Sequence, residues 1–193
     1  MPACRADLAL AERLKRKDES AADELFRSLG GELYGYAYRM LDDPGLAEDA
    51  LQEAMIGALT NIERYDGSTS LRTWLYGILR HKIYDILRKT GREVPVRAPD
   101  PESGGFQDGT WKDGVTVEPW DENAEMLDVV RSCIRSLPHS QREALLLRAV
   151  QGMTSQEAAD VLQLSNANLR QVLHRARQAV RKCADTKLGR QES

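Results

Sequence analysis

The chain has 193 residues, of which 41% are hydrophobic, and a formal net charge of -3 at pH 7. This length can bury the core of one medium domain or two small ones. The longest apolar run, around Leu145–Leu147, is far shorter than the roughly 20 residues of a membrane helix, and no signal-peptide pattern opens the chain. We therefore expect a cytoplasmic protein without membrane insertion.

The cysteines and histidines indicate no metal site, no cofactor and no disulfide framework. The cysteines lie far apart and form no C-x-x-C pair, and the histidines form no i,i+4 pair. The sequence contains neither a phosphate-binding loop nor a nucleophile elbow. We expect a protein in a reducing compartment that acts by binding, not as an enzyme. The three cysteines are Cys4, Cys133 and Cys183.

Apolar residues at helical spacing predict an all-helical N-terminal domain over residues 1–90. Two turns separate the helical segments, at Asp43-Pro44-Gly45 and at Asp66-Gly67-Ser68, because glycine permits positive φ and proline removes a backbone donor. Ser70 or Thr69 is placed to cap the helix after the second turn. The predicted segments are residues 8–40, 46–59 and 71–87.

The charge is distributed unevenly along the chain. Residues 42–66 carry a net charge of -6, whereas residues 165–190 carry +6. Local charge governs encounter with charged partners more than the total does. Such a chain is suited to hold DNA at one place and a basic protein surface at another.

Proline, glycine and acidic residues fill residues 91–122, a composition that predicts a linker with a net charge of -5. Repulsion between its charges, which keeps it solvated, is one interpretation. The aromatic residues Phe106, Trp111 and Trp120 favour another, in which parts of the linker dock on a surface, because exposed tryptophans are uncommon.

The C-terminal domain, residues 123–193, is predicted to open with two helices. Apolar residues from Met126 onward repeat at three and four positions up to Leu137-Pro138, where the first helix stops. A second helix begins near His139. It ends at Gly152, where a left-handed residue is favoured.

A helix-turn-helix follows these two helices. Thr154 and Glu157 have the spacing of a capping box, and a helix with closely packing alanines starts there. The short turn Gln163-Leu164-Ser165 precedes a second helix, which Ser165 can cap. The side chains that this last helix directs inward are Leu169, Val172, Leu173, Ala176 and Val180.

The outer surface of the last helix carries amides and basic groups. Asn and Gln can pair with adenine and Arg with guanine, each good pair contributing about 1–3 kcal/mol of discrimination. A merely solvated face is the alternative, but the capping box, the turn and the charge agree with base reading. The candidate DNA-reading residues are Asn166, Asn168, Arg170, Gln171, His174, Arg175, Arg177 and Arg181.

With these residues in place, the chain resembles the extracytoplasmic-function (ECF) group of bacterial sigma factors, of the sigma-70 family, over nearly its whole length. The N-terminal motifs are Ala47-Glu48-Asp49-Ala50-Leu51-Gln52-Glu53, Arg64-Tyr65-Asp66-Gly67, Thr73-Trp74-Leu75 and Asp85-Ile86-Leu87-Arg88. The C-terminal motifs are Leu137-Pro138, Arg142-Glu143-Ala144, Gly152-Met153, Glu157-Ala158-Ala159 and His174-Arg175-Ala176-Arg177.

The resemblance implies two small helical domains and a role in promoter recognition. In this family the N-terminal domain binds core RNA polymerase and opens the minus-ten element, and the C-terminal domain reads the minus-thirty-five element. The resemblance places Asp49, Gln52 and Glu53 on the coiled coil of the polymerase β′ subunit and the C-terminal domain at the β flap. It also suggests an anti-sigma factor as a partner. Complementary charge gives the acidic helix a physical reason to dock there.

The resemblance further implies a pocket for a base flipped out of the non-template strand. A base stacked on an aromatic ring gains about 1–3 kcal/mol, and arginines and lysines nearby would meet phosphates. Trp74 is expected in the core instead. The implied minus-ten residues are Asn61, Tyr65, Asp66, Gly67, Ser68, Arg72, Arg80, His81, Lys82 and Arg88.

Two departures from the family pattern bear on promoter sequence. His81 stands where relatives often carry asparagine, which changes the expected choice of captured base. Ala167, Asn168 and Gln171 stand where many relatives carry glycine, threonine and serine. The minus-thirty-five sequence is therefore expected to differ as well.

Two other function classes remain open at this point. A helix-turn-helix repressor or activator that binds operators as a dimer explains the C-terminal domain equally well, but leaves the acidic helix and linker without a purpose. An interaction protein, such as an anti-sigma-like regulator, predicts partner binding without DNA preference, which a gel shift at several salt concentrations distinguishes.

Overall fold

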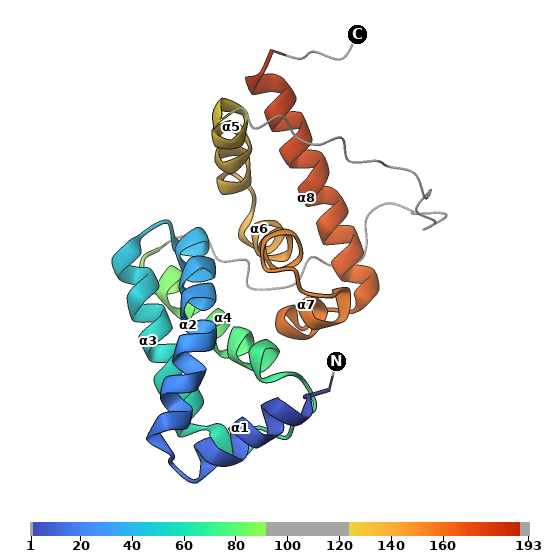
Figure 1. The fold of residues 1–193 in the computed structure, drawn as a ribbon. Helices are drawn as coiled ribbons and strands as arrows, with labels where there is room; N and C mark the ends of the chain where they lie inside the picture. The colour runs from blue at the N-terminus through green and yellow to red at the C-terminus, as the bar shows by residue number, and fades with distance from the viewer. Residues whose placement is uncertain (1, 92–123, 190–193) are drawn as a thin grey trace.

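The computed structural model describes residues 2–91 and 124–189, and within these ranges every regular element is a helix (Figure 1). The prediction of two small helical domains is confirmed. The predicted linker and its three aromatic residues lie outside the described residues, except for Gly91 at its start. The N-terminal domain comprises α1 (Arg5–Lys15), α2 (Glu19–Leu41), α3 (Pro44–Thr60), the short 3-10 helix η1 (Ile62–Arg64) and α4 (Leu71–Lys89).

The break between α2 and α3 is built from three consecutive residues. Asp42 ends α2 in the left-handed conformation, with φ of 54°. Asp43 then caps α3, its Oδ1 accepting a hydrogen bond of 3.0 Å from the Leu46 amide, and Pro44 occupies the first turn. The turn was predicted, but the left-handed residue is an aspartate, not the glycine of that turn.

The loop before α4 is held by the start of the chain. Gly67 has φ of 74°, a conformation that favours glycine, and a Cβ added there would lie 2.7 Å from Leu8 Cδ2 of α1, so the Leu8 side chain would have to move. The Ala3 amide donates to the Gly67 carbonyl at 3.0 Å. Of the two capping residues that the sequence allowed, Ser70 caps α4 by accepting from the Thr73 amide at 3.1 Å.

The C-terminal domain follows the predicted helix-turn-helix closely. Thr154 and Glu157 form the capping box, with the Glu157 amide donating to Thr154 Oγ1 at 3.2 Å and the Thr154 amide to the Glu157 carboxylate at 2.8 Å. Gln163 turns the chain in the left-handed conformation, and Ser165 caps the last helix. The elements are α5 (Ala124–Arg135), α6 (His139–Leu145), a π-helical turn η2 (Leu146–Val150), α7 (Ser155–Leu162) and α8 (Asn166–Lys187).

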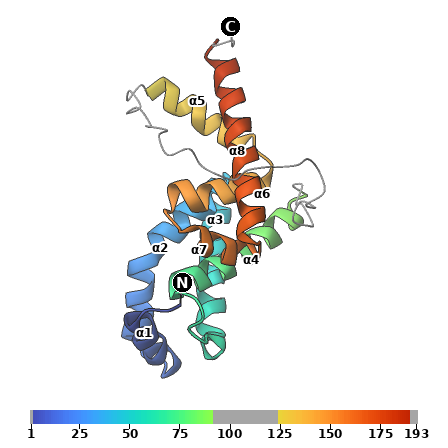
Figure 2. The ribbon, with the colours of Figure 1, turned by 90° about the vertical axis from the view of Figure 1, so that its right-hand side faces the viewer.

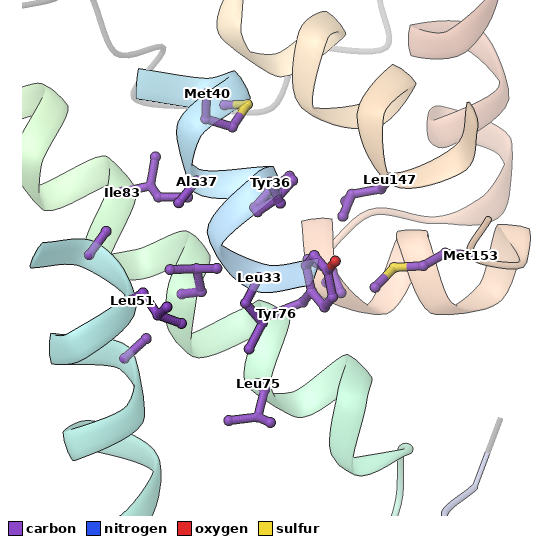
Figure 3. Close-up of a cluster of buried hydrophobic side chains, with 14 of the residues drawn as sticks. Leu33, Tyr36, Ala37, Met40, Leu51, Leu75, Tyr76, Ile83, Leu147 and Met153 are labelled. Atoms are coloured by element: carbon purple, nitrogen blue, oxygen red, sulfur yellow. The ribbon is translucent and has the colours of Figure 1, made fainter. Parts of the chain in front are cut away.

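One continuous apolar cluster joins the two domains. Helices α2, α3 and α4 pack on one another, and α7 lies against α4 (Figures 1 and 2). Leu147 and Met153 of the C-terminal domain point toward Tyr36 and Tyr76 of the N-terminal domain (Figure 3). All four side chains are fully buried. The hydrophobic effect therefore stabilises the contact between the domains as well as each domain.

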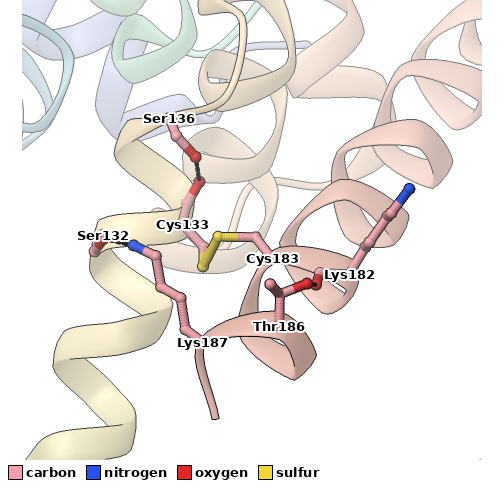
Figure 4. Close-up of a disulfide and its surroundings, with 7 residues drawn as sticks. All are labelled: Ser132, Cys133, Ser136, Lys182, Cys183, Thr186 and Lys187. Atoms are coloured by element: carbon pink, nitrogen blue, oxygen red, sulfur yellow. Dashed lines mark hydrogen bonds between the residues drawn. A yellow bond between two sulfur atoms is a disulfide. The ribbon is translucent and has the colours of Figure 1, made fainter. Parts of the chain in front are cut away.

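A disulfide joins Cys133 of α5 to Cys183 of α8, with a Cα–Cα distance of 5.8 Å (Figure 4). The expectation that the cysteines form no disulfide framework is wrong for this pair. The two residues are 50 apart in sequence, so no local spacing reveals them, and only the packing of α5 along α8 brings them together. Cys4 is a free thiol.

Reducing this disulfide is expected to destabilise the C-terminal domain by up to about 4 kcal/mol, because the bond closes a loop of about 50 residues in the unfolded chain. Guanidinium unfolding followed by circular dichroism, with and without dithiothreitol, measures the difference. The Cys4→Ser variant should behave as the parent chain does, and the Cys133→Ser/Cys183→Ser variant as the reduced chain. Equal midpoints in the presence and absence of reductant would contradict the expectation.

Thr154→Ala is expected to lower the free energy of unfolding by about 1 kcal/mol, because it leaves the Glu157 amide in the first turn of α7 without its acceptor. Urea unfolding gives the value. Thr154→Ser keeps the hydroxyl and serves as the control. A Thr154→Ala chain as stable as the control would show that the capping box contributes nothing.

Candidate polymerase and nucleic-acid interface

The outer face of α8 presents most of the predicted DNA-reading side chains to solvent. Residues 166, 170, 174, 177 and 181 recur at three- and four-residue spacing and lie along one side of the helix. Two members of the predicted set, Asn168 and Arg175, are half-buried instead of exposed. The exposed members of the predicted set are Asn166, Arg170, Gln171, His174, Arg177 and Arg181.

Helix α7 steadies the start of this face. The Asn166 amide group donates to Gln156 Oε1 of α7 at 2.8 Å, and Arg170 Nε donates to the Asn166 carbonyl at 3.3 Å. The stripe therefore begins from side chains that are already held in place. In a helix-turn-helix the N-terminal residues of the second helix are the ones that meet base edges.

The acidic face of α3 is likewise exposed. Asp49, Gln52 and Glu53 lie on one side of the helix, and Ile56, one turn further on, is 65% exposed beside them. Glu53 forms an ion pair of 3.2 Å with Lys82 of α4. Sequence reasoning found the acids but missed the exposed isoleucine, whose apolar surface adds a contact suited to a protein partner.

The predicted base pocket is partly closed. Tyr65 is only 4% exposed, its hydroxyl donates to the Thr69 carbonyl at 2.7 Å, and its ring lies 5.2 Å from that of Trp74. Burial raises the pKa of Tyr65 to about 12. Asn61 is half-buried and donates to the Gly57 carbonyl at 2.8 Å. Tyr65 thus supports the loop from inside, and Trp74 takes part in packing.

The loop from Asp66 to Ser68 faces solvent, apart from the half-buried Gly67. Asp66 Oδ1 accepts from the Ser68 amide at 2.9 Å, and hydrogen bonding to Ser68 lowers the pKa of Asp66. His81, on α4, is exposed. Asp66, Ser68 and His81 are therefore the exposed residues of the predicted base pocket.

The basic residues of α4 do not form one surface. Lys82 faces α3 and its acid Glu53, and Arg88 pairs with Asp85 on the exposed end of the helix. Arg72 and Arg80 instead face the C-terminal domain. The predicted phosphate-binding set is thus divided among three directions in this conformation.

Arg72 bridges the two domains. It pairs with Glu32 of α2, and its Nη2 donates to the Gln151 carbonyl at the end of η2 at 2.6 Å. The guanidinium carbon lies 5.4 Å from the centre of the Tyr76 ring. Glu32, on α2, also accepts from the Tyr76 hydroxyl at 2.8 Å.

Glu143 of α6 is buried in the domain boundary, with 1% of its surface exposed. Its carboxylate accepts three hydrogen bonds, from Tyr36 at 2.9 Å, Arg80 Nε at 2.9 Å and Tyr84 at 2.8 Å. We call these four residues the Glu143 clasp. Burial raises the pKa of Glu143, and Arg80 and the tyrosine hydrogen bonds oppose that shift. Burial and the nearby carboxylate raise the pKa of both tyrosines.

Sequence reasoning missed the clasp. The available signal was a single acid at the start of an apolar run, Glu143 followed by Ala144 and Leu145–Leu147, because such a pattern places a charge on a buried helix face. The sequence gives no indication of its partners, which are 59 to 107 residues away.

The two domains together define a class of protein. A helix-turn-helix with an exposed amide and arginine stripe, joined to a helical domain with an acidic face, is the architecture of a DNA-binding transcription protein. Within the described residues, no helix is long and apolar enough to span a membrane.

Comparison with known proteins supplies the family. Residues 25–93 match the family model of sigma-70 region 2, and residues 127–180 match that of sigma-70 region 4. The chain is 31% identical over 159 residues to the ECF RNA polymerase sigma factor SigM of Bacillus subtilis strain 168, covering 82% of this chain and 92% of SigM. It is also 31% identical over 178 residues to the RNA polymerase sigma-H factor of Pseudomonas aeruginosa strain PAO1, covering 91% and 92% of the two chains. The chain therefore belongs to the ECF sigma factors of the sigma-70 family.

Two solved structures share the fold. The structure of CnrH in complex with the cytosolic domain of CnrY aligns with a TM-score of 0.69 and 23% identity, covering 94% of this chain and 99% of that one. The sigma factor RpoE of Bartonella quintana, in complex with the anti-sigma factor NepR, aligns with a TM-score of 0.61 and 23% identity, covering 83% and 94%.

Proposed function

We propose that this chain joins core RNA polymerase and directs it to promoters, acting in the cytoplasm by binding and not by catalysis. The exposed amide and arginine stripe of α8 supports this proposal, because it lies in a chain whose two domains match sigma-70 regions 2 and 4. In this assignment the N-terminal domain, residues 1–90, binds polymerase and the minus-ten element. Residues 91–122 are the linker, and residues 123–193 bind the minus-thirty-five element.

The acidic face of α3 is assigned to the polymerase. Asp49, Gln52 and Glu53 would meet the β′ coiled coil, with Ile56 adding apolar contact at the same site. Opposite charges on two surfaces speed their encounter and fix their register. The C-terminal domain is assigned to the β flap. An anti-sigma factor is a further partner, as it is for the RpoE of Bartonella quintana.

The helix α8 is assigned to the major groove of the minus-thirty-five element. Arg170 and Gln171 lie in its first turns, where a recognition helix meets base edges, and Arg177 and Arg181 lie further along, toward the phosphates. The basic charge of this helix favours any duplex, while its amides and arginines discriminate among sequences.

The minus-ten element is assigned to the N-terminal domain. The loop Asp66-Gly67-Ser68, with Asn61, Tyr65 and His81 beside it, would hold the flipped base. Arg72, Arg80, Lys82 and Arg88 would meet backbone phosphates. All four bind acidic or carbonyl groups of the protein in the free chain, so phosphates would replace those partners.

Run-off transcription with purified core polymerase on a library of genomic fragments tests the proposal directly. We expect transcripts from a small set of promoters only when the chain is added. A dimeric helix-turn-helix regulator would give none under these conditions. That alternative is not favoured, because the match to sigma-70 region 2 covers most of the N-terminal domain.

Arg170→Ala is expected to weaken binding to the minus-thirty-five duplex by about 1–3 kcal/mol and to relax sequence preference at one position. Fluorescence anisotropy on specific and scrambled duplexes measures both effects. Lys182→Ala removes the same charge from the same helix outside the predicted reading set, and should weaken both duplexes equally. Equal losses on both duplexes for Arg170→Ala as well would remove its base-reading role.

Reversing the acidic face with Asp49→Lys/Glu53→Lys is expected to weaken binding to core polymerase, because like charges would then face a basic surface. A pull-down at moderate salt measures retention. The matched control, Glu12→Lys/Asp23→Lys, changes the same charge on exposed residues of α1 and α2. If the two double variants retain polymerase equally, the assignment of α3 is wrong.

A further inference from the structure

The contact between the domains uses arginines that the proposed function assigns to DNA. Arg80 donates to Glu143, and Arg72 donates to the Gln151 carbonyl. Both acceptors belong to the C-terminal domain. In the free chain, therefore, the C-terminal domain lies on the part of α4 that promoter phosphates would need.

In the Glu143 clasp, the N-terminal domain supplies every donor of an anion-binding site, and the C-terminal domain supplies the anion. All three donors to the carboxylate come from the N-terminal domain, Tyr36 from α2 and Arg80 and Tyr84 from α4. The Arg80 guanidinium carbon lies 4.7 Å from the centre of the Tyr84 ring, which fixes its orientation. One arginine and two hydroxyls around a single carboxylate would serve a phosphate oxygen equally well.

Glu143 is also the one buried charged residue in the described part of the chain. The other ion pair across the boundary, Arg135 with Asp42 at 3.5 Å, is at least half exposed on both sides and contributes little. The apolar contacts of Leu147 and Met153 stabilise the closed arrangement, but they carry no charge that DNA could replace. Of the two ion pairs across the boundary described here, the clasp is therefore the buried one, in which a phosphate can take the place of the carboxylate.

A buried ion pair behaves differently across a domain boundary than inside a core. Its desolvation cost is recovered when the domains separate, because Glu143 and Arg80 both return to water. Neutralising Glu143 alone leaves the Arg80 charge without its partner while the domains are closed, which shifts the equilibrium toward an open arrangement without unfolding either domain. This makes the carboxylate a reversible occupant of the site.

We propose that Tyr36, Arg80 and Tyr84 form an anion-binding site that Glu143 fills in the free chain and that a backbone phosphate of DNA fills once the domains separate. The identity of the second ligand rests on the proposed function, whereas the occupation by Glu143 does not. The free chain is then a closed form whose N-terminal domain excludes DNA, and its apparent affinity for DNA is reduced by the fraction of closed molecules.

Glu143→Gln in the full chain tests the proposal with two readouts. Small-angle X-ray scattering without DNA should show a larger radius of gyration than the parent chain. Anisotropy with a fluorescein-labelled single strand of about 20 nucleotides of mixed sequence should show about tenfold tighter binding at low salt. An unchanged radius with unchanged affinity would overturn the proposal.

Arg80→Ala separates opening from DNA binding. It removes the partner of Glu143 and should enlarge the radius of gyration as Glu143→Gln does, but it also removes the phosphate contact and should not tighten DNA binding. If Glu143→Gln/Arg80→Ala bound the single strand as tightly as Glu143→Gln alone, the phosphate would lie elsewhere and the site assignment would be wrong. If Glu143→Gln opened the chain without any gain in DNA binding, the occupation by Glu143 would stand and the DNA ligand would be refuted.

Glu12→Gln is the matched control, because it neutralises an exposed glutamate of α1 and should leave both readouts unchanged. Glu143→Gln changes a buried charge and could disturb folding. Tyr84→Phe is a milder second variant, because it removes only one hydroxyl from the clasp. It should enlarge the radius of gyration by less than Glu143→Gln does, and it should tighten DNA binding less than Glu143→Gln does, because it also removes one donor to the phosphate. Circular dichroism verifies that each variant keeps its helices, and a folded Tyr84→Phe and Glu143→Gln pair that both stayed closed would contradict the clasp.

Discussion

A single buried carboxylate, that of Glu143, links the two domains of this sigma factor inside their contact. Glu143 enters the N-terminal domain from α6 and takes its three hydrogen bonds from that domain. A charge that is 1% exposed is tolerated only while those donors surround it. The alignment of α7 on α4 and the burial of Leu147 and Met153 against the N-terminal core are compatible with this placement.

In the closed arrangement, one of the two proposed DNA-binding surfaces is exposed and the other is covered. The stripe on α8 remains exposed, so the C-terminal domain is open to a duplex. Arg72 and Arg80 of α4 are covered, and the acidic face of α3 is exposed on the N-terminal domain. In the proposed assignment polymerase docks on α3, and it can therefore bind the closed chain while the proposed minus-ten surface is still covered.

The sequence predicted what local residue patterns determine. The capping box of Thr154 and Glu157, the three-residue turn before α8 and the left-handed Gly152 all appear where expected, because each depends on residues only a few positions apart. The pairing of Cys133 with Cys183 and the contacts of the Glu143 clasp could not be predicted from the sequence. Their partners are 50 to 107 residues apart, and packing alone brings them together. Tyr65 lies between these cases, since its position in the loop was expected and its burial against Trp74 was not.

The most direct test of this account measures the distance between the domains with and without polymerase. Donor and acceptor fluorophores attached through unnatural amino acids at Arg39 of α2 and Arg131 of α5, both exposed and each about one turn from the ion pair of Asp42 with Arg135, report that distance by single-molecule energy transfer. The account predicts one high-transfer population for the free chain and a low-transfer population once core polymerase is added. A free chain with low transfer, or a distance that polymerase leaves unchanged, would contradict it.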